Sequence, residues 1–269
     1  MSGFHILPPS WTSGATVTAN SEDSPDVSAM NTLFVQPSRK WRSATLGTLR
    51  LTYTASGEKP WDTVALKAHN AWVTGTVQIF ASNIFANVFT SPSYTSAVMP
   101  LRFAGDLTPF TEYDTWIYTG ALRSHQYIGI QIIDNSNPDA YFQLGVTLIG
   151  VQFEPRSGPD IGMQIGRDDP SQMNRARNSE AVVRPLRGID AGSLSFPKQS
   201  PQEMIRWYQL NRIYGSKIPM IFKWDPIPGS QLTEQYFFYY GYPQWPSGGP
   251  FTLATGHGDW DVQMGIVEL

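Results

Sequence analysis

Apolar and polar residues alternate strictly in several segments of the first half of the chain. Residues 49–54, 61–68 and 75–81 each show this period of two, and His69 with Asn70 supplies turn-forming residue types after the second segment. Such alternation places successive side chains on opposite faces of a β-strand, one toward a core and one toward water. Further strands are predicted at 97–103, 114–118, 127–133 and 142–155.

The second half of the chain carries one strong helix signal. Ser200, Pro201 and Glu203 form a capping box with proline at the first helical position, and Gly215 follows Tyr214 as a stop. These residues predict a helix over 201–214 that packs on a sheet. The apolar surface predicted for that contact comprises Met204, Ile205 and Tyr208, extended by Leu210, Ile213 and Tyr214. Strands are predicted around it at 192–196, 219–226, 235–240 and 265–269.

These elements predict a mainly β protein with two domains. Residues 1–30, rich in Ser, Thr, Pro and Asp, are interpreted as an extended N-terminal segment. A β-sandwich domain follows at 31–156 and a smaller α+β domain with one packed helix at 192–269, joined by a charged arm or linker at 157–191.

The charged segment allows two interpretations. A solvated connector is the simpler one, because such stretches are commonly linkers. The alternative is a projecting arm that clasps a neighbouring subunit. The arginines that would then contact that subunit are Arg167, Arg175, Arg177, Arg184 and Arg187.

Four phrases of the first domain carry a family resemblance: 64–71, 75–82, 127–138 and 142–155. Together they resemble the galactose-binding-like jelly roll found in minor tail proteins of tailed bacteriophages. The stretch 193–226, with its strand, helix and second strand, resembles the second domain of the same proteins. The resemblance implies a distal-tail-like structural protein of a phage tail tip or baseplate, located in the virion and made in the bacterial host. Its implied partners are copies of itself, the tail tube, and tail hub or fibre proteins.

Composition removes several functional classes. The 269-residue chain has a net charge of −3, so it lacks the basic field that nucleic-acid binding requires. It has no cysteine, which excludes disulfides, thiol catalysis and cysteine-ligated zinc. Neither a secretory signal nor an apolar run of the roughly 20 residues that a membrane helix requires is evident, so we expect no membrane insertion.

Metal and catalytic motifs are weak. His5, His69 and His125 are scattered, and His257 with Asp259 and Asp261 is more simply a turn than a cation site. The stretch 134–139 offers oxygens for calcium, yet its spacing differs from an EF-hand, so a loop is the simpler interpretation. Sequence gives no pairing among the carboxylates Asp106, Glu112, Asp114 and Asp134 that a glycosidase would require. We therefore expect no cofactor, no metal and no catalysis.

Aromatic residues give the remaining functional signal. Exposed tryptophans beside polar groups can stack on sugar rings, and His69, Asn70 and Trp72 at the end of one strand are the first candidates for glycan contact. The same residue types also serve as core or as interface anchors. In the aromatic loop 241–250, Tyr242 and Trp245 are candidate subunit contacts. The main hypothesis is therefore tail assembly, and the alternative is an adhesion module of the same particle that recognises host surface glycans.

Overall fold

The computed structural model describes residues 3–102, 112–159, 164–168, 172–175, 181–184, 189–224, 238–246, 251–253 and 259–269. The chain divides into two compact units. The first, called here the sandwich unit, comprises His5–Phe153 and Ile221–Phe238. The second, the C-terminal unit, comprises Met1–Phe4, Glu154–Met220 and Tyr239–Leu269.

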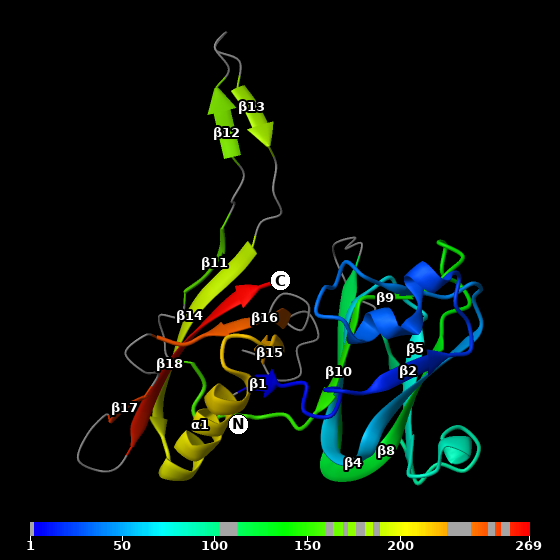
Figure 1. Ribbon diagram of the computed structural model, residues 1–269, viewed down its shortest axis with the longest axis horizontal. Helices are drawn as coiled ribbons and strands as arrows, with labels where there is room; N and C mark the ends of the chain where they lie inside the picture. Colours follow the sequence, from blue (N-terminus) through cyan, green and yellow to red (C-terminus); the bar gives the residue numbers. More distant parts are fainter. Residues whose placement is uncertain are drawn as a thin grey trace. The chain divides into compact units, whose positions relative to one another are not determined.

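Two long antiparallel strands organise the sandwich unit (Figure 1). Strands β4 (Thr48–His69) and β8 (Tyr113–Ile133) pair along their length, with register shifts that interrupt the ladder. One half of this ribbon pairs with β2 (Thr16–Ala19) and β5 (Thr76–Ser82), and the other half pairs with β10 (Val146–Gly150). Because both halves bury residues in one core, the ribbon closes a β-sandwich on itself.

The register of this ribbon defines two ends of the sandwich. Thr48 pairs with Ile133 and His69 pairs with Tyr113, so both strands begin and end at what we call the open end. The middle of the ribbon, where Lys59 pairs with His125, forms the opposite, bend end. Short strands complete the unit: β3 (Trp41–Arg42), β6 (Tyr94–Thr95), β7 (Met99–Pro100) and β9 (Gln143–Leu144).

The N-terminal segment differs from its prediction as an extended lead-in. Trp11 is fully buried and donates its indole N–H to the carbonyl of His125. Val17 in β2 lies opposite Tyr53 of β4 and joins the core. The 3-10 helices η1 (Pro25–Val27) and η2 (Ala29–Leu33) continue the segment. Its Ser, Thr and Pro content therefore reflects strand edges and turns within the sandwich.

The C-terminal unit is built on an antiparallel sheet. Strands β16 (Phe238–Gln244), β18 (Trp260–Glu268), β14 (Ile189–Gln199) and β11 (Gln164–Asp168) lie side by side in that order, and β17 (Phe251–Leu253) also pairs with β18. Strands β12 (Gln172–Arg175) and β13 (Ala181–Arg184) form a separate two-stranded ribbon. Strands β1 (Phe4–Leu7) and β15 (Met220–Trp224) complete the described strands.

Helix α1 (Pro201–Tyr214) confirms the predicted helix and its capping box, but its apolar face is only partly as predicted. Leu210 is buried as predicted, whereas Ile205 and Tyr208 are exposed and the buried Trp207 was not predicted. The indole of Trp207 packs 4.8 Å from the ring of Phe196. That large aromatic contact sets the rotation of the helix about its axis, overriding the more numerous smaller apolar side chains. Among the described residues, the structure contains no helix with the length and apolarity needed to span a membrane.

Replacing Ser200 by alanine tests the helix cap. The Ser200 hydroxyl accepts the backbone N–H of Glu203, whose carboxylate accepts the backbone N–H of Ser200. We expect Ser200→Ala to lower the free energy of unfolding by about 1 kcal/mol, because one helix N–H loses its partner. Urea denaturation measures the change, and Ser216→Ala, an exposed serine beyond the helix, should leave it unaltered.

Candidate ligand-binding site

The open end of the sandwich presents an exposed tryptophan. Trp72 is 40% exposed and lies three residues beyond the end of β4, next to the exposed Val73. Its backbone N–H donates to Oδ2 of the buried Asp134, 3.0 Å away. Gly75 closes the turn with its N–H on the carbonyl of Trp72, and a Cβ at Gly75 would stand only 3.0 Å from that carbonyl. Two hydrogen bonds therefore fix the main chain of Trp72, one made by its N–H and one by its carbonyl.

An arginine lies beside this tryptophan. The guanidinium of the half-buried Arg102 stacks 4.1 Å from the ring centroid of Tyr113 and lies 6.0 Å from that of Trp72. The preceding residue, Leu101, is buried and donates its N–H to the carbonyl of Gly75. Arg102 is thus anchored through its main chain to the same turn that carries Trp72. We call Trp72, Val73 and Arg102 the Trp72 patch.

His69 links the two chain segments that carry the patch, at Ala71 and at Leu101, through hydrogen bonds. Its Nε2 lies 2.8 Å from the hydroxyl of Thr115, which donates its own proton to the carbonyl of Leu101. His69 Nε2 must therefore carry a proton, and Nδ1 is the bare nitrogen that accepts the backbone N–H of Ala71. Burial, with the nearby positive charge of Arg102, lowers the pKa of His69 from 6.5 to about 3. The imidazole is therefore neutral at physiological pH and is hydrogen-bonded through both of its nitrogens.

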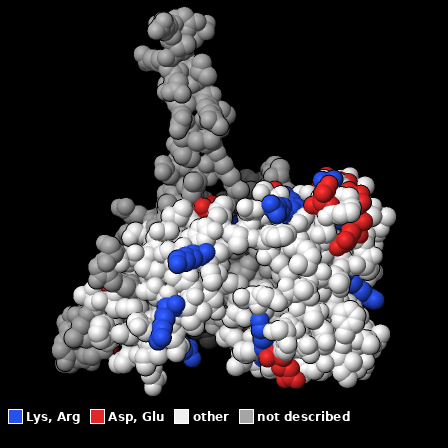
Figure 2. Space-filling view, in the orientation of Figure 1, with Lys and Arg blue, Asp and Glu red and all other residues white. Residues whose placement is uncertain are grey.

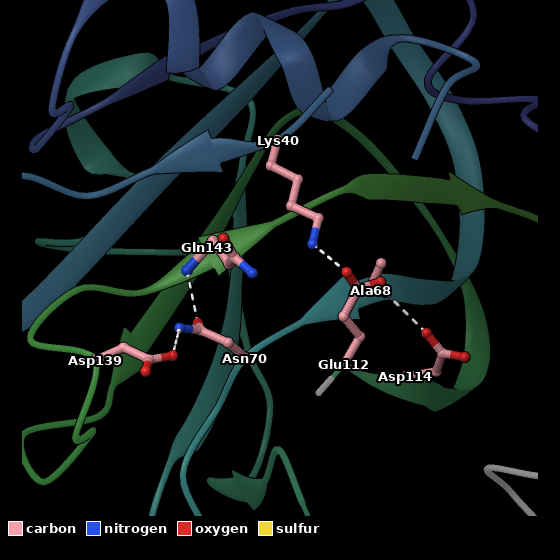
Figure 3. A network of polar contacts seen from close by, with 7 residues as sticks. All are labelled: Lys40, Ala68, Asn70, Glu112, Asp114, Asp139 and Gln143. Atoms are coloured by element: carbon pink, nitrogen blue, oxygen red, sulfur yellow. Dashed lines mark hydrogen bonds and ion pairs between the residues drawn. The ribbon is translucent and has the colours of Figure 1, made fainter. Parts of the chain in front are cut away.

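Asn70 ties the loops of the open end together (Figure 3). Its amide N–H groups donate to the carboxylate of Asp139 and the carbonyl of Tyr141, and its amide oxygen accepts the backbone N–H of Gln143. Its own carbonyl accepts from the amide of Asn137. Its backbone N–H also donates to the carbonyl of Gln143, so with five hydrogen bonds and 7% exposure Asn70 connects the loops of the open end.

An unusual backbone conformation directs the chain into this site. Ala68 has φ of 60°, a left-handed conformation that costs a non-glycine residue free energy. The carboxylate of Asp114 holds it by accepting the N–H of Ala68 at 2.8 Å, while its other oxygen pairs with Lys67. Figure 3 shows Asp114 facing Ala68 from β8, with the ion pair of Lys40 and Glu112 nearby. The turn at Ala68 places His69 inward.

The residues predicted to contact a glycan therefore divide by exposure. His69 and Asn70 are buried and support the loops, so neither presents its side chain at the surface, while Trp72 does. Sequence reasoning missed Arg102 and its platform Tyr113. No motif marks either residue: Tyr113 comes near through its pairing with His69, and Arg102 follows Leu101, whose N–H donates to the carbonyl of Gly75.

Three of the carboxylates considered for metal binding or catalysis make hydrogen bonds or ion pairs within the protein. Asp134 accepts from Trp72 and Asn137, and Glu112 and Asp114 pair with lysines. Across the described residues, no group of three or more His, Asp or Glu side chains could hold a metal ion. Asp106 and His257 lie outside the described residues.

The residues predicted for subunit contact lie in the C-terminal unit. Tyr242 lies within β16, and the half-buried Trp245 places its ring 6.4 Å from that of Trp207. The main chains of Arg167, Arg175 and Arg184 belong to β11, β12 and β13 respectively. Arg177 and Arg187 lie outside the described residues.

The chain has distant structural similarity to carbohydrate-binding modules of the galactose-binding-like jelly-roll type. A chitosan-binding module of a Paenibacillus chitosanase/glucanase aligns with a TM-score of 0.39 and 14% identity, over 53% of this chain and 97% of the module. The family 32 module of NanJ from C. perfringens, solved with galactose, aligns at 0.41 and 11%, over 56% and 99%. A Ruminococcus gnavus GH29 fucosidase aligns at 0.37 and 9%, over 55% of this chain and 27% of the enzyme.

Comparison by sequence gives no match, either to a protein-family model or to a curated protein.

Proposed function

We propose that the sandwich unit binds carbohydrate at the Trp72 patch. The observation that supports this is an exposed indole on main chain fixed by buried polar groups: Asp134 bonds the N–H of Trp72, and His69 braces the adjacent Ala71. An aromatic face stacks on the apolar C–H face of a sugar ring, and neighbouring donors take the hydroxyls. Because the loops are already braced, binding does not have to order them, which lowers its entropic cost.

Replacing Trp72 by alanine tests this function. We expect the full-length protein to bind members of an immobilised glycan panel, and Trp72→Ala to reduce the affinity for them by at least tenfold. Stacking on the indole supplies most of the contact area, so its removal should raise the dissociation rate above all. Biolayer interferometry on the panel measures both constants.

A matched control is Phe85→Ala. Phe85 is another exposed aromatic side chain, 53% exposed, beside Tyr127. It follows β5, whose last residue Ser82 pairs with Tyr127 toward the bend end, so its loss should leave glycan binding unaltered. Equal binding by wild type and Trp72→Ala, or loss of binding in Phe85→Ala alone, would remove the site from the Trp72 patch. Absence of binding to any glycan would refute the function.

The C-terminal unit supports a second proposal, in which the chain is an assembly subunit of a phage tail tip or baseplate. Its β12–β13 ribbon pairs only with itself in the described strand order, and an isolated two-stranded ribbon is marginally stable in water. A neighbouring subunit would stabilise it. The face seen in Figure 2 also carries few charged side chains between wide uncharged areas, as suits surfaces covered by other subunits.

Deleting the ribbon tests the assembly role. Light scattering and negative-stain microscopy of the full chain should show a defined multimer, and the chain lacking residues 172–184 should be monomeric. A multimer that persists after the deletion would exclude the ribbon as the contact. The two proposals are compatible, since a tail subunit can carry a glycan site.

A further inference from the structure

We infer that protonation of His125 breaks its hydrogen bond to Trp61 and releases residues 8–15 from the bend end of the sandwich. The inference is independent of the proposed glycan site, which lies at the open end. The fully buried Trp61 of β4 donates its indole N–H to Nδ1 of His125 in β8, 3.1 Å away. Because a nitrogen that accepts a hydrogen bond carries no proton, His125 is neutral in this arrangement.

The same histidine anchors the N-terminal part of the chain through its backbone. Its carbonyl accepts the indole N–H of the fully buried Trp11, 3.0 Å away. Lys59, the register partner of His125 in β4, donates from Nζ to the carbonyls of Trp11 and Ser13. The backbone N–H of Trp11 bonds the carbonyl of Ile149 in β10. Trp11 is therefore attached to the ribbon at a residue whose charge depends on pH.

A proton on Nδ1 is incompatible with this geometry. The imidazolium would present an N–H to the indole N–H of Trp61, so two donors would face each other and the buried indole would lose its acceptor. Trp61 is packed edge-on against Tyr94, with ring centroids 5.7 Å apart, which restricts its movement. The displacement therefore falls on His125, the residue that also bonds Trp11.

The charged groups around His125 favour displacement once it is protonated. Arg123 on β8 and Lys59 on β4 are positive, Glu58 on β4 is negative, and residues 8–15 carry no charge. Protonation would thus add a positive charge where positive groups already prevail. Burial and Arg123 lower the pKa of His125 below its usual 6.5, and Glu58 opposes them. The hydrogen bond to Trp61 is therefore present at neutral pH and is lost as the pH falls through this lowered pKa.

NMR of the tryptophan indole groups tests the inference. The full-length protein, labelled with nitrogen-15 at the indoles, is titrated from pH 8 to pH 4, and each signal is assigned by its absence from the corresponding phenylalanine variant. We expect the signals of Trp61 and Trp11 to change together, with a midpoint below pH 6.5. Hydrogen–deuterium exchange of residues 11–15, corrected for the intrinsic effect of pH, should be about tenfold faster below that midpoint than above it, because hydrogen bonds are lost.

Variants at the pair assign the effect. The amide oxygen of His125→Asn can accept the indole N–H in place of Nδ1 but does not titrate, so its indole signals and exchange should stay constant with pH. Trp61→Phe removes the donor and should raise the pKa of His125 toward 6.5. His69→Gln, changed at the open end, is the control and should titrate like the wild type.

Three results would overturn the inference. The first is a wild type whose Trp61 signal does not change down to pH 4, and the second is a titration that persists in His125→Asn. The third is a change at Trp61 without faster exchange in residues 11–15, which would show that the N-terminal part of the chain stays bound.

Discussion

Replacing His69 by glutamine should make the free energy of unfolding fall less steeply as the pH is lowered. The pKa of His69 is about 3 in the folded protein against 6.5 for an unperturbed histidine. As the pH falls through 6.5, the unfolded chain takes up a proton that the folded protein excludes, so the unfolded state is favoured. The stability due to the neutral imidazole is therefore fully present above pH 6.5 and is lost as the pH falls toward 3.

The magnitude follows from the width of this window. Each pH unit inside it costs about 1.4 kcal/mol, and three units cost about 4 kcal/mol. Glutamine can still donate from Nε2 to Thr115 but does not titrate, and it leaves the N–H of Ala71 without its acceptor. The variant should therefore be less stable than wild type at pH 7, and the difference should shrink by about 1.4 kcal/mol per unit on acidification.

Urea denaturation of both proteins from pH 7 to the lowest pH at which both fold gives the measurement. Only the difference between the proteins is interpreted, because His125 and the carboxylates are present in both and cancel. A difference that stays constant across the window would show that His69 takes up its proton with the same pKa in the folded and unfolded states. The interpretation of His69 as a buried imidazole that stays neutral in acid would then be wrong.

Replacing Asn70 by alanine should destabilise the loops of the open end. The change removes three side-chain hydrogen bonds, to Asp139, Tyr141 and Gln143, in a site that is 7% exposed. The backbone N–H of the half-buried Gln143 would lose its acceptor, which is the costly outcome of such deletions. We expect the free energy of unfolding to fall by about 2–4 kcal/mol.

Asn135→Ala controls for a general sensitivity of the same loop, since Asn135 is exposed and should tolerate the change within about 0.5 kcal/mol. Asn70→Asp adds a sharper comparison. Its carboxylate would stand within hydrogen-bonding distance of Asp139, so its destabilisation should ease in acid, as the carboxyls protonate. If Asn70→Ala were as stable as Asn135→Ala, Asn70 would not organise these loops.

The strands of the sandwich were predictable because burial on one face imposes a period of two. Residues 49–54 and 61–68 both lie in β4, where sequence suggested two separate strands. The join was not predictable, since 55–60 includes glycine and proline, which normally interrupt a strand. Register shifts between Thr54 and Lys59 and between Trp61 and Thr63 let the ribbon bend without ending.

The site was only partly predictable. Asn and His after an alternating segment mark a turn, and that signal located the loop that carries Trp72 correctly. It could not separate the exposed residue from the buried ones, because His69 and Asn70 are polar yet satisfy their hydrogen bonds inside the protein. Arg102 reaches the patch through β7, which pairs with β5, and through the hydrogen bond of Leu101 to Gly75, contacts that no local motif marks. The burial of Trp207 likewise depends on a tertiary contact, with Phe196, so the helical pattern did not distinguish it from its neighbours.

Hydrogen–deuterium exchange of the full-length protein, with and without a glycan that it binds, tests whether the ligand lies at the Trp72 patch. We expect slower exchange on binding in the segments 69–76 and 134–143, which carry and brace Trp72. The bend-end segments 83–87 and 119–126 should remain unchanged. Protection confined to the bend end or to the C-terminal unit would place the ligand elsewhere and exclude the Trp72 patch as the binding site.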